Sequence, residues 1–328
     1  MHVAVTGSIA TDHLMTFRGR FAESLIVEQL DKISVSFLAE DLQIRRGGVG
    51  ANIAFGMGNL GQRPVLVGAV GADFADYRSW LERHGVDCES VHVSTTAHTA
   101  RFICTTDDDS AQIATFYAGA MSEARHIELQ PVGARVGGLD LVLVGPNDPV
   151  AMARHTQECR DRGIPFAADP SQQLAWMDGA GIRELIDGAA YLFSNEYESH
   201  LISQKTGWDA REIGGHVGTQ VMTRGKDGAV VLTAGDEPIE VPAARETRVA
   251  DPTGVGDAFR AGFLTGLSVG LDHRRCAQLG SMLATYVIET VGPQEYALGG
   301  ARFLERLGEA YGQEAVAAIG RHVRCFRP

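Results

Sequence analysis

Cysteine is sparse in this chain of 328 residues, and histidine occurs without metal-binding spacing. The five cysteines are scattered, odd in number and never spaced as Cys-x-x-Cys, so they indicate neither a disulfide framework nor a zinc site. The eleven histidines contain no His-Glu-x-x-His pattern. The sequence therefore argues against a metal ion held by protein nitrogen or sulfur atoms.

An excess of basic residues and long apolar runs are also lacking. The formal net charge is -12, from 29 Lys and Arg against 41 Asp and Glu, with no basic stripe interleaved with aromatic residues. This pattern excludes nucleic acid as an expected partner. No apolar run approaches the ~20 residues that span a bilayer. The chain enters a strand-like segment at residues 3–5 without a basic leader, so we expect a cytoplasmic protein with no membrane partner.

Glycine, by contrast, is abundant. Its 39 copies make about 12% of the chain, against a usual ~7%. They cluster after apolar segments rather than in linkers, which predicts loops where a ligand approaches the backbone. With 45% hydrophobic residues, the chain is long enough for one large domain, alone or with a small appendage.

The order of apolar segments predicts an α/β fold. Short, continuously apolar strands that alternate with helices are typical of a mostly parallel, doubly wound sheet covered on both faces. The expected strands are 3–6, 65–70, 141–144, 165–168, 191–193 and 220–223, with an edge hairpin at 230–232 and 239–241 and closing helices through 271–290 and 300–319.

Three further segments have the pattern of half-exposed strands. Residues 32–38 alternate apolar and polar side chains, and 100–106 and 112–117 form a predicted hairpin around a polar turn at 107–110. We interpret these as a small β-sheet lying over the main domain, contributed by two insertions at about 12–45 and 91–118 of a single-domain chain.

The segment 251–263 contains the most informative pattern for chemistry. Gly254 and Gly256 precede a helical pattern, so the amides of Val255, Gly256 and Asp257 can face outward and bind an anion. Asp257 adds a carboxylate where a phosphate would also be drawn, which suggests that the amides hold a phosphoryl group in transfer while Asp257 accepts a proton. Alternatively, Asp257 only offsets the helix dipole and the glycines form an ordinary turn.

Polar residues also follow several predicted strands, at the edge where ligands bind in doubly wound sheets. Asn195 and Glu198 lie on one side of a first helical turn, as a capping box or as a group that holds Mg²⁺ through water. The P-loop and Gly-x-Gly-x-x-Gly spacings do not occur after these strands. The other residues at this edge are Ser8, Asp12, Asp169, Gln172, Gln173, Ser194 and Thr223 to Gly228, each of which could instead be a helix cap or turn residue.

Three motifs together resemble a known family. The segments 47–52 (Gly-Gly-Val-Gly-Ala-Asn) and 251–257 (Asp-Pro-Thr-Gly-Val-Gly-Asp), about 200 residues apart, are similar to the two signatures of the ribokinase-like (PfkB-type) carbohydrate kinases, and Asn195-x-x-Glu198 is similar to that family's magnesium-associated motif. The resemblance spans essentially the whole chain and implies a ribokinase-like three-layer α/β/α fold with a β lid. The segments 4–14, 99–102 and 168–173 look most like the bacterial, mycobacterial-type adenosine kinases.

The resemblance implies transfer of the ATP γ-phosphoryl group to the 5′-hydroxyl of adenosine, giving AMP. Asp257 would be the base and Gly254, Val255 and Gly256 the anion hole; Asp12, Gly48 and Asn52 would contact the ribose; Ser8, Ser36, Phe102, Phe116, Gln172 and Gln173 would surround the nucleoside; Asn195, Thr223, Gly225 and Gly228 would line the ATP side; and Glu198 would hold Mg²⁺ through water. Aromatic residues such as Phe102 and Phe116 also serve as plain packing on short strands.

The same resemblance implies Mg²⁺ with ATP as cofactor, a monovalent cation such as K⁺ as a further candidate, and a homodimer through the β lid. Three alternatives stay open at this point. The acceptor could be ribose, fructose or another nucleoside; the chain could be a non-catalytic nucleotide-binding protein; or its β-sheet could be purely an interface. Fold does not decide among them.

Overall fold

Among the residues that the structure describes, the main sheet has eight strands. The computed structural model describes residues 1–24, 32 and 34–323. The strand order is β14-β13-β12-β11-β10-β9-β1-β4; the pairs from β4 to β12 are parallel, and β13 and β14 add an antiparallel hairpin at one edge. The strands are β1 (Val3–Thr6), β4 (Val65–Val67), β9 (Leu141–Val144), β10 (Phe166–Ala168), β11 (Tyr191–Asn195), β12 (Thr219–Thr223), β13 (Ala229–Thr233) and β14 (Ile239–Val241).

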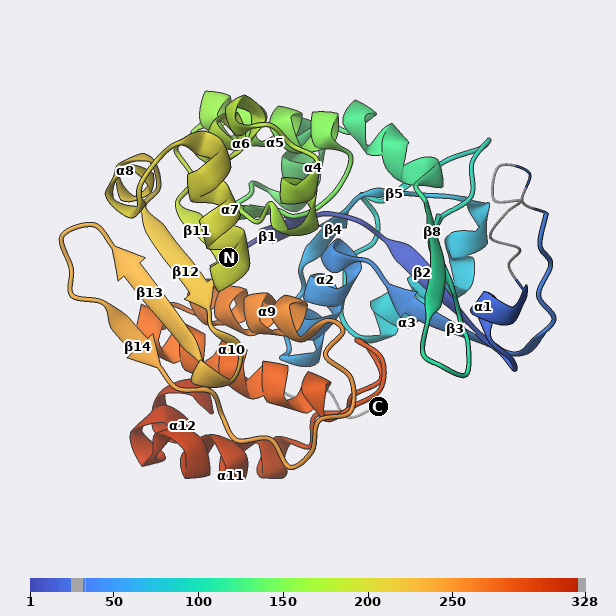
Figure 1. The fold of residues 1–328 in the computed structure, drawn as a ribbon. Coiled ribbons are helices and arrows are strands. Elements are labelled where there is room, and N and C mark those ends of the chain that lie inside the picture. Colours follow the sequence, from blue (N-terminus) through green and yellow to red (C-terminus); the bar gives the residue numbers. More distant parts are fainter. Residues whose placement is uncertain (25–31, 33, 324–328) are drawn as a thin grey trace.

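Helices cover both faces of this sheet, which gives three layers (Figure 1). Alternate strand residues point to opposite faces: Val3 and Val5 join one core cluster, and Ala4 joins the other. One face packs against α4 (Leu129–Val136), α5 (Pro149–Arg162), α6 (Gly179–Ile186), α7 (Glu196–Thr206) and α8 (Ala210–His216); the other packs against α2 (Val49–Asn59), α3 (Ala75–Arg83), α9 (Val255–Ser268), α10 (His273–Ile288), α11 (Gly300–Tyr311) and α12 (Gln313–Ile319). The predicted fold class is confirmed.

Close packing of α9 against α10 follows from small residues on both helices. A Cβ atom built on Gly262 would lie 2.6 Å from the Cα of Gly280, so the two backbones touch where neither residue carries a side chain. This contact fixes the helix that begins at the predicted anion site.

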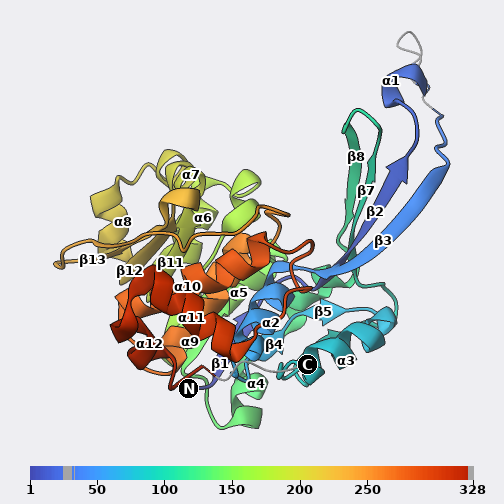
Figure 2. The same ribbon diagram turned by 90° about the horizontal axis from the view of Figure 1, so that it is seen from below.

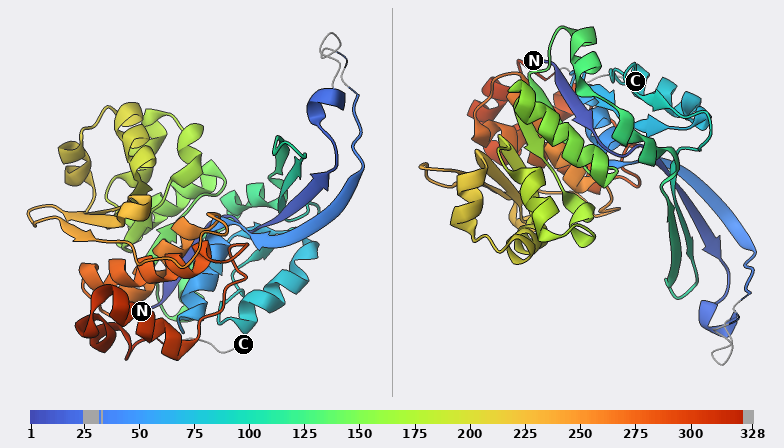
Figure 3. Two further views of the ribbon diagram at one scale, coloured as in Figure 1. Left: turned by 60° about the horizontal axis from the view of Figure 1, so that its bottom comes forward. Right: turned by 90° about the horizontal axis from the view of Figure 1, so that it is seen from above.

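A second sheet of four strands extends away from the main body (Figures 2 and 3). Its order is β3-β2-β7-β8, and we call it the lid sheet. The strands are β2 (Ala10–Phe17), β3 (Ala39–Gly47), β7 (Ala100–Thr106) and β8 (Gln112–Tyr117), and the short helix α1 (Phe21–Ser24) lies near its outer end. The expected hairpin at 100–106 and 112–117 is correct.

One strand prediction in this region was wrong. Of the predicted strand 32–38, residue 33 lies outside the described residues, and 34–38 form no strand, because β2 pairs with the chain only from Ala39 onward. The apolar Phe37 instead packs its ring against Phe17 and Phe21. Asp12 lies in β2, between Arg45 of β3 and Phe102 of β7.

The predicted strand 65–70 divides into β4 and β5 (Ala69–Val70), and β5 pairs separately with β6 (His92–Val93). The break falls at Gly68, where a Cβ atom would lie 2.8 Å from the carbonyl oxygen of Gly7. Short 3₁₀ helices complete the structure: η2 (Ala72–Phe74), η3 (Gly119–His126), η4 (Ser171–Ala175) and η5 (Gly225–Asp227). No helix in the described ranges is long and apolar enough to cross a membrane.

Candidate active site

A cavity of about 550 Å³ lies where the lid sheet meets the main domain. We call it the acceptor cavity. It brings together residues from segments far apart in the chain, including most of those predicted to contact the nucleoside. Its lining residues are Ser8, Ala10, Asp12, Gly48, Val49, Asn52, Phe102, Phe116, Met121, Pro146, Gln172, Gln173, Trp176, Thr253 and Asp257.

Ser36 is the predicted substrate residue that the structure does not bring to this cavity. It is exposed in the segment before β3, and it is absent from the acceptor cavity's lining. The reason is the late start of β3: the chain at residue 36 has not yet joined the sheet that carries Asp12 and Phe102.

One end of the acceptor cavity is polar and closely fitted to the backbone. Gly48 has a φ of 91°, and a Cβ atom there would lie 2.6 Å from the amide nitrogen of Ala10 and the carbonyl oxygen of Ser8. No larger residue fits this turn. Burial raises the pKa of Asp12 to about 6; the nearby Arg45 guanidinium opposes this effect and the Asp251 carboxylate adds to it.

The other end of the cavity is largely apolar. Phe102 and Phe116 are direct cross-strand partners in β7 and β8, so their rings lie on the same face of the lid sheet. Gln173 donates from Nε2 to the carbonyl oxygen of Asn147 at 2.9 Å. Trp176 contributes an indole ring that is 86% exposed, and no sequence pattern singled it out.

The start of α9 forms the inner wall of the cavity. Gly254 has a φ of 78°, and within the described part of the chain no side chain caps this helix. A Cβ atom at Gly254 would lie 2.5 Å from the Cβ of Pro293. The Val255 amide donates a long hydrogen bond of 3.3 Å to the Pro252 carbonyl oxygen. This first-turn amide is therefore partly occupied within the protein.

Asp257 is held at this helix start by a hydrogen bond from another element. Asn52 of α2 donates from Nδ2 to Asp257 Oδ2 at 2.8 Å. Burial raises the pKa of Asp257, while the bond from Asn52 and the charge of Arg260 lower it and the Glu198 carboxylate raises it further. Burial and Glu198 therefore favour the neutral carboxyl group, whereas Asn52 and Arg260 favour the carboxylate.

A buried network of charged side chains contacts the first turn of α9. The Arg260 guanidinium lies 2.6 Å (Nε) and 2.7 Å (one terminal nitrogen) from the two oxygens of Asp169, and 3.7 Å from Glu198. It also donates to the carbonyl oxygen of Gly256 at 3.2 Å. Burial raises the pKa of Asp169 to about 6, with Arg260 opposing. Sequence reasoning missed Arg260, although a lone charge in the apolar pattern 258–264 was a usable signal.

A second cavity, of about 400 Å³, also borders the α9 start. We call it the donor cavity. Its lining includes the predicted Thr223, Gly225 and Gly228 as well as Val255 and Gly256. Gly228 has a φ of 90°, and a Cβ atom there would lie 2.1 Å from the carbonyl oxygen of Val241. The cavity wall is mostly apolar: Ala243, Ala244, Val249, Phe259, Ala284 and Ile288.

Asn195 does not line the donor cavity. Its partner in the neighbouring strand, Thr223, does line it. Asn195 and Glu198 form a capping box: each side chain accepts from the other's backbone amide at 2.8 Å. One Glu198 oxygen, Oε2, thus contacts the Asn195 amide and lies near Arg260. The other oxygen fits a role in holding Mg²⁺ through water, since Mg²⁺ keeps most of its water shell.

The described residues contain no cluster of three or more His, Cys, Asp or Glu side chains that could hold a metal directly. Asp251 already accepts from the amides of Thr253 and Gly292 and lies 3.5 Å from Arg45. Its carboxylate oxygens are therefore engaged within the protein.

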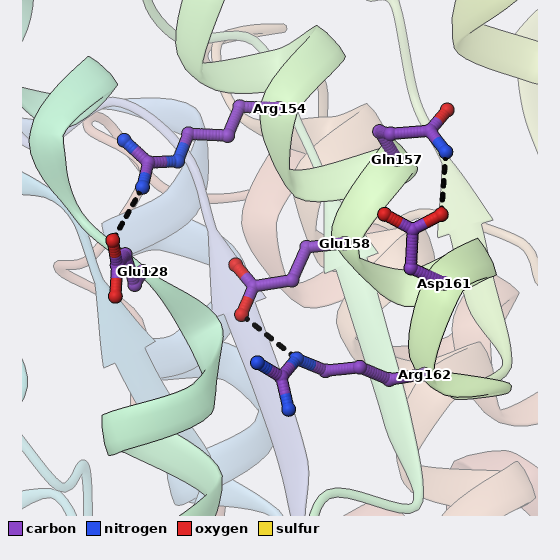
Figure 4. A pocket seen from close by; sticks show the side chains of 6 residues that line it. All are labelled: Glu128, Arg154, Gln157, Glu158, Asp161 and Arg162. Atoms are coloured by element: carbon purple, nitrogen blue, oxygen red, sulfur yellow. Dashed lines mark hydrogen bonds and ion pairs between the residues drawn. The ribbon is translucent and has the colours of Figure 1, made fainter.

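A charged hollow between the α4 start and α5 lies apart from both cavities (Figure 4). Four of its five charged side chains form two ion pairs, Arg154 with Glu128 at 2.7 Å and Arg162 with Glu158 at 3.1 Å. Glu158 also accepts from the amides of Leu129 and Gln130, which caps α4. This hollow is explained by helix capping and surface ion pairs.

The linings of both cavities include residues at the α9 start, which carries a carboxylate and has no side-chain cap among the described residues. This arrangement is typical of enzymes that pass an anionic group between two ligands. Comparison with known proteins agrees. The model of the pfkB family of carbohydrate kinases matches residues 8–298, and the chain belongs to this family. It is an ATP-dependent phosphotransferase of the PfkB type.

Nucleoside kinases are prominent among its relatives. The chain is 32% identical to the nucleoside kinase of Methanothermobacter thermautotrophicus over 82% of this chain and 86% of that protein. The structure of Burkholderia thailandensis nucleoside kinase in complex with inosine is 36% identical, with a TM-score of 0.81 over 94% of this chain and 98% of that one. The Methanocaldococcus jannaschii nucleoside kinase is 25% identical, with a TM-score of 0.80 over 94% and 98%.

Proposed function

We propose that this protein is an adenosine kinase, which transfers the γ-phosphoryl group of ATP to the 5′-hydroxyl of adenosine and yields AMP for purine salvage. The observation that carries the proposal is the form of the acceptor cavity. Its polar end, at Asp12, Gly48 and Asn52, suits vicinal ribose hydroxyls, and its apolar end, between Phe102 and Phe116, suits a flat base.

The size of the cavity supports a nucleoside over a simple sugar. A volume of about 550 Å³ lies in the range of drug-sized ligand sites, and ribose or fructose would leave the aromatic end empty. Gln172 and Gln173 add amide groups that can pair with the edge of a purine. Known nucleoside kinases of similar sequence, one of them solved with inosine, point in the same direction.

In the proposed reaction, the 5′-hydroxyl oxygen of adenosine bonds to the γ-phosphorus of ATP while Asp257 accepts the hydroxyl proton. The bond from that phosphorus to the bridging oxygen breaks, and ADP leaves. The amides of Gly256 and Asp257, with partial help from Val255, stabilise the transferring group. Bound Mg²⁺ would neutralise phosphate charge, and Glu198 would hold one of its water ligands. Thr223, Gly225 and Gly228 would place the nucleotide in the donor cavity.

The lid sheet has two faces with different properties. The face that carries Asp12, Phe102 and Phe116 lines the acceptor cavity, and we propose that it closes over the nucleoside and excludes water. The other face exposes Leu42 and Ile44, at 53% and 61%, in register with β2. We propose that this face forms a homodimer contact. Light scattering should give a dimer mass for the native chain and a monomer mass for Ile44→Glu.

The function is tested by ATP consumption with Mg²⁺ across adenosine, guanosine, inosine, ribose and fructose, with products identified by mass. Preferential conversion of adenosine to AMP is the expected result. Preferential turnover of inosine or guanosine would retain the nucleoside class and overturn the choice of adenosine. Turnover of ribose or fructose alone would overturn the roles of Phe102, Phe116, Gln172 and Gln173, and no turnover would indicate a non-catalytic nucleotide-binding protein.

A further inference from the structure

A buried chain of hydrogen bonds runs from the base of the lid sheet to Asp257. The Tyr77 hydroxyl donates to the carbonyl oxygen of Gly47 at 2.9 Å. Gln294 donates from Nε2 to the Tyr77 oxygen at 2.5 Å and to Asn52 Oδ1 at 2.9 Å. Asn52 in turn donates from Nδ2 to Asp257 Oδ2 at 2.8 Å. These groups come from β3, α3, α2, α9 and the loop between α10 and α11.

The direction of this chain is fixed at its far end. A backbone carbonyl can only accept, so the Tyr77 hydroxyl must donate to Gly47 and present its lone pairs to Gln294. Burial raises the pKa of Tyr77, so the hydroxyl keeps the proton that it donates. Gln294 must then turn its NH₂ group toward Tyr77, and the second hydrogen of that group reaches Asn52 Oδ1.

The consequence at Asn52 concerns which end of its amide faces the carboxylate. With Oδ1 occupied by Gln294, the NH₂ group is directed at Asp257 Oδ2. A carboxylate accepts this bond, whereas a protonated Oδ2 would need the amide reversed. We propose that Tyr77 and Gln294 are positioning residues that lock the amide of Asn52 with its NH₂ group toward Asp257, and thereby keep the base ionised near neutral pH.

This role rests on the proposed function, because it requires Asp257 to act as the base. The bond from Asn52 opposes the effect of burial on the pKa of Asp257. A hydrogen bond to an ionised group changes the ionisation equilibrium by about 1 to 2 pH units. Losing the lock should therefore move the acid limb of the pH profile of kcat, measured at saturating adenosine, to higher pH by that amount.

The test uses Gln294→Met, which removes the donor without adding charge, and Tyr77→Phe, which removes only the hydroxyl. Tyr296→Phe is the matched control, because it deletes a buried hydroxyl of the same loop that lies near Asn59 rather than Asn52. The pH profile of kcat at saturating adenosine is measured for each variant. The titration of Asp257 is followed in parallel by carbon NMR of aspartate-labelled protein, with the signal assigned from Asp257→Asn.

Both variants should raise the pH at which Asp257 titrates, and the control Tyr296→Phe should leave it unchanged. Because Tyr77 acts through Gln294, the double variant should shift no further than Gln294→Met. A lower melting temperature with the Asp257 transition unmoved would show that the chain is only a structural brace, and would overturn the proposal. If Gln294→Met does not fold, an unmoved transition in Tyr77→Phe overturns it equally. A native protein without nucleoside turnover contradicts the proposed function, whereas the NMR titration still tests the lock.

Discussion

Replacing Arg260 with methionine should destabilise the protein in a strongly pH-dependent way. The guanidinium lies within 2.7 Å of both oxygens of Asp169, and both side chains are almost completely buried. Methionine fills much of the same volume but leaves the Asp169 carboxylate buried without its partner. Breaking a buried pair on one side costs about 3 to 5 kcal/mol, and we expect the free energy of unfolding to fall by this amount at pH 8.

The pH dependence follows from the pKa of Asp169. In the native protein burial raises this pKa to about 6 despite Arg260, and without Arg260 it should rise further. A carboxyl group whose folded pKa lies above its unfolded value stabilises the fold at low pH, and this stabilisation is lost as the pH rises through the folded pKa. The difference between native protein and variant should thus grow by about 1.4 kcal/mol per pH unit above pH 6, until Asp169 ionises.

Urea denaturation at pH 6, 7 and 8 measures this difference. The double variant Arg260→Met with Asp169→Asn should recover much of the loss and show little pH dependence, since no buried charge is left at that pair. Arg302→Met is the surface control: its pair with Glu305 is more than half exposed, so its removal should cost no more than about 1 kcal/mol at every pH. A loss for Arg260→Met that is equal at pH 6 and pH 8 would refute the electrostatic reasoning.

Three further predictions concern the acceptor cavity. Adenosine should quench the fluorescence of Trp176, which lines the cavity and is 86% exposed; an undiminished signal change in Trp176→Phe would contradict this placement. Adenosine affinity, followed by that quenching, should fall as the pH drops below about 6, because protonated Asp12 no longer accepts from both ribose hydroxyls; Asp12→Asn should bind weakly with no such transition. Gly48→Ala should cost of order 1 to 3 kcal/mol in stability or adenosine binding. The cost should exceed that of Gly137→Ala, because Gly137 has a similar φ of 84° but its Cβ would meet nothing within 4 Å. Equal costs would show that backbone strain, and not the lack of space at Gly48, sets the effect.

Local sequence patterns were sufficient to predict much of the fold and part of the site. Apolar runs such as 141–144 are strands because both sheet faces bury them, and that requirement is visible in the residues themselves. Gly254 was indicated by the glycines before a helical pattern, whereas Gly48 was implied by the resemblance to the PfkB-type kinases. In the structure each occupies a positive φ beside another backbone or a proline ring, which few residues other than glycine do.

The rest depended on contacts between distant segments. Whether 32–38 forms a strand is decided by where β2 stops pairing, which alternation alone does not reveal. Tyr77 and Gln294 are more than 200 residues apart, yet they hydrogen-bond to each other directly and connect Gly47 with Asn52. Nothing local marks either residue. Trp176 and Met121 join the cavity because the lid sheet faces η4 and η3 across it, a geometry that becomes visible only in three dimensions.

The most direct test of the central claim compares native protein with Asp257→Asn, measuring kcat for adenosine phosphorylation and the equilibrium affinity for adenosine in the same preparations. Asparagine preserves shape and the neighbourhood of Asn52 but cannot take the proton. We expect kcat to fall by ~10² to 10⁴-fold while the affinity for adenosine changes little. Turnover that persists while adenosine binding is lost would contradict the role of Asp257 as the base.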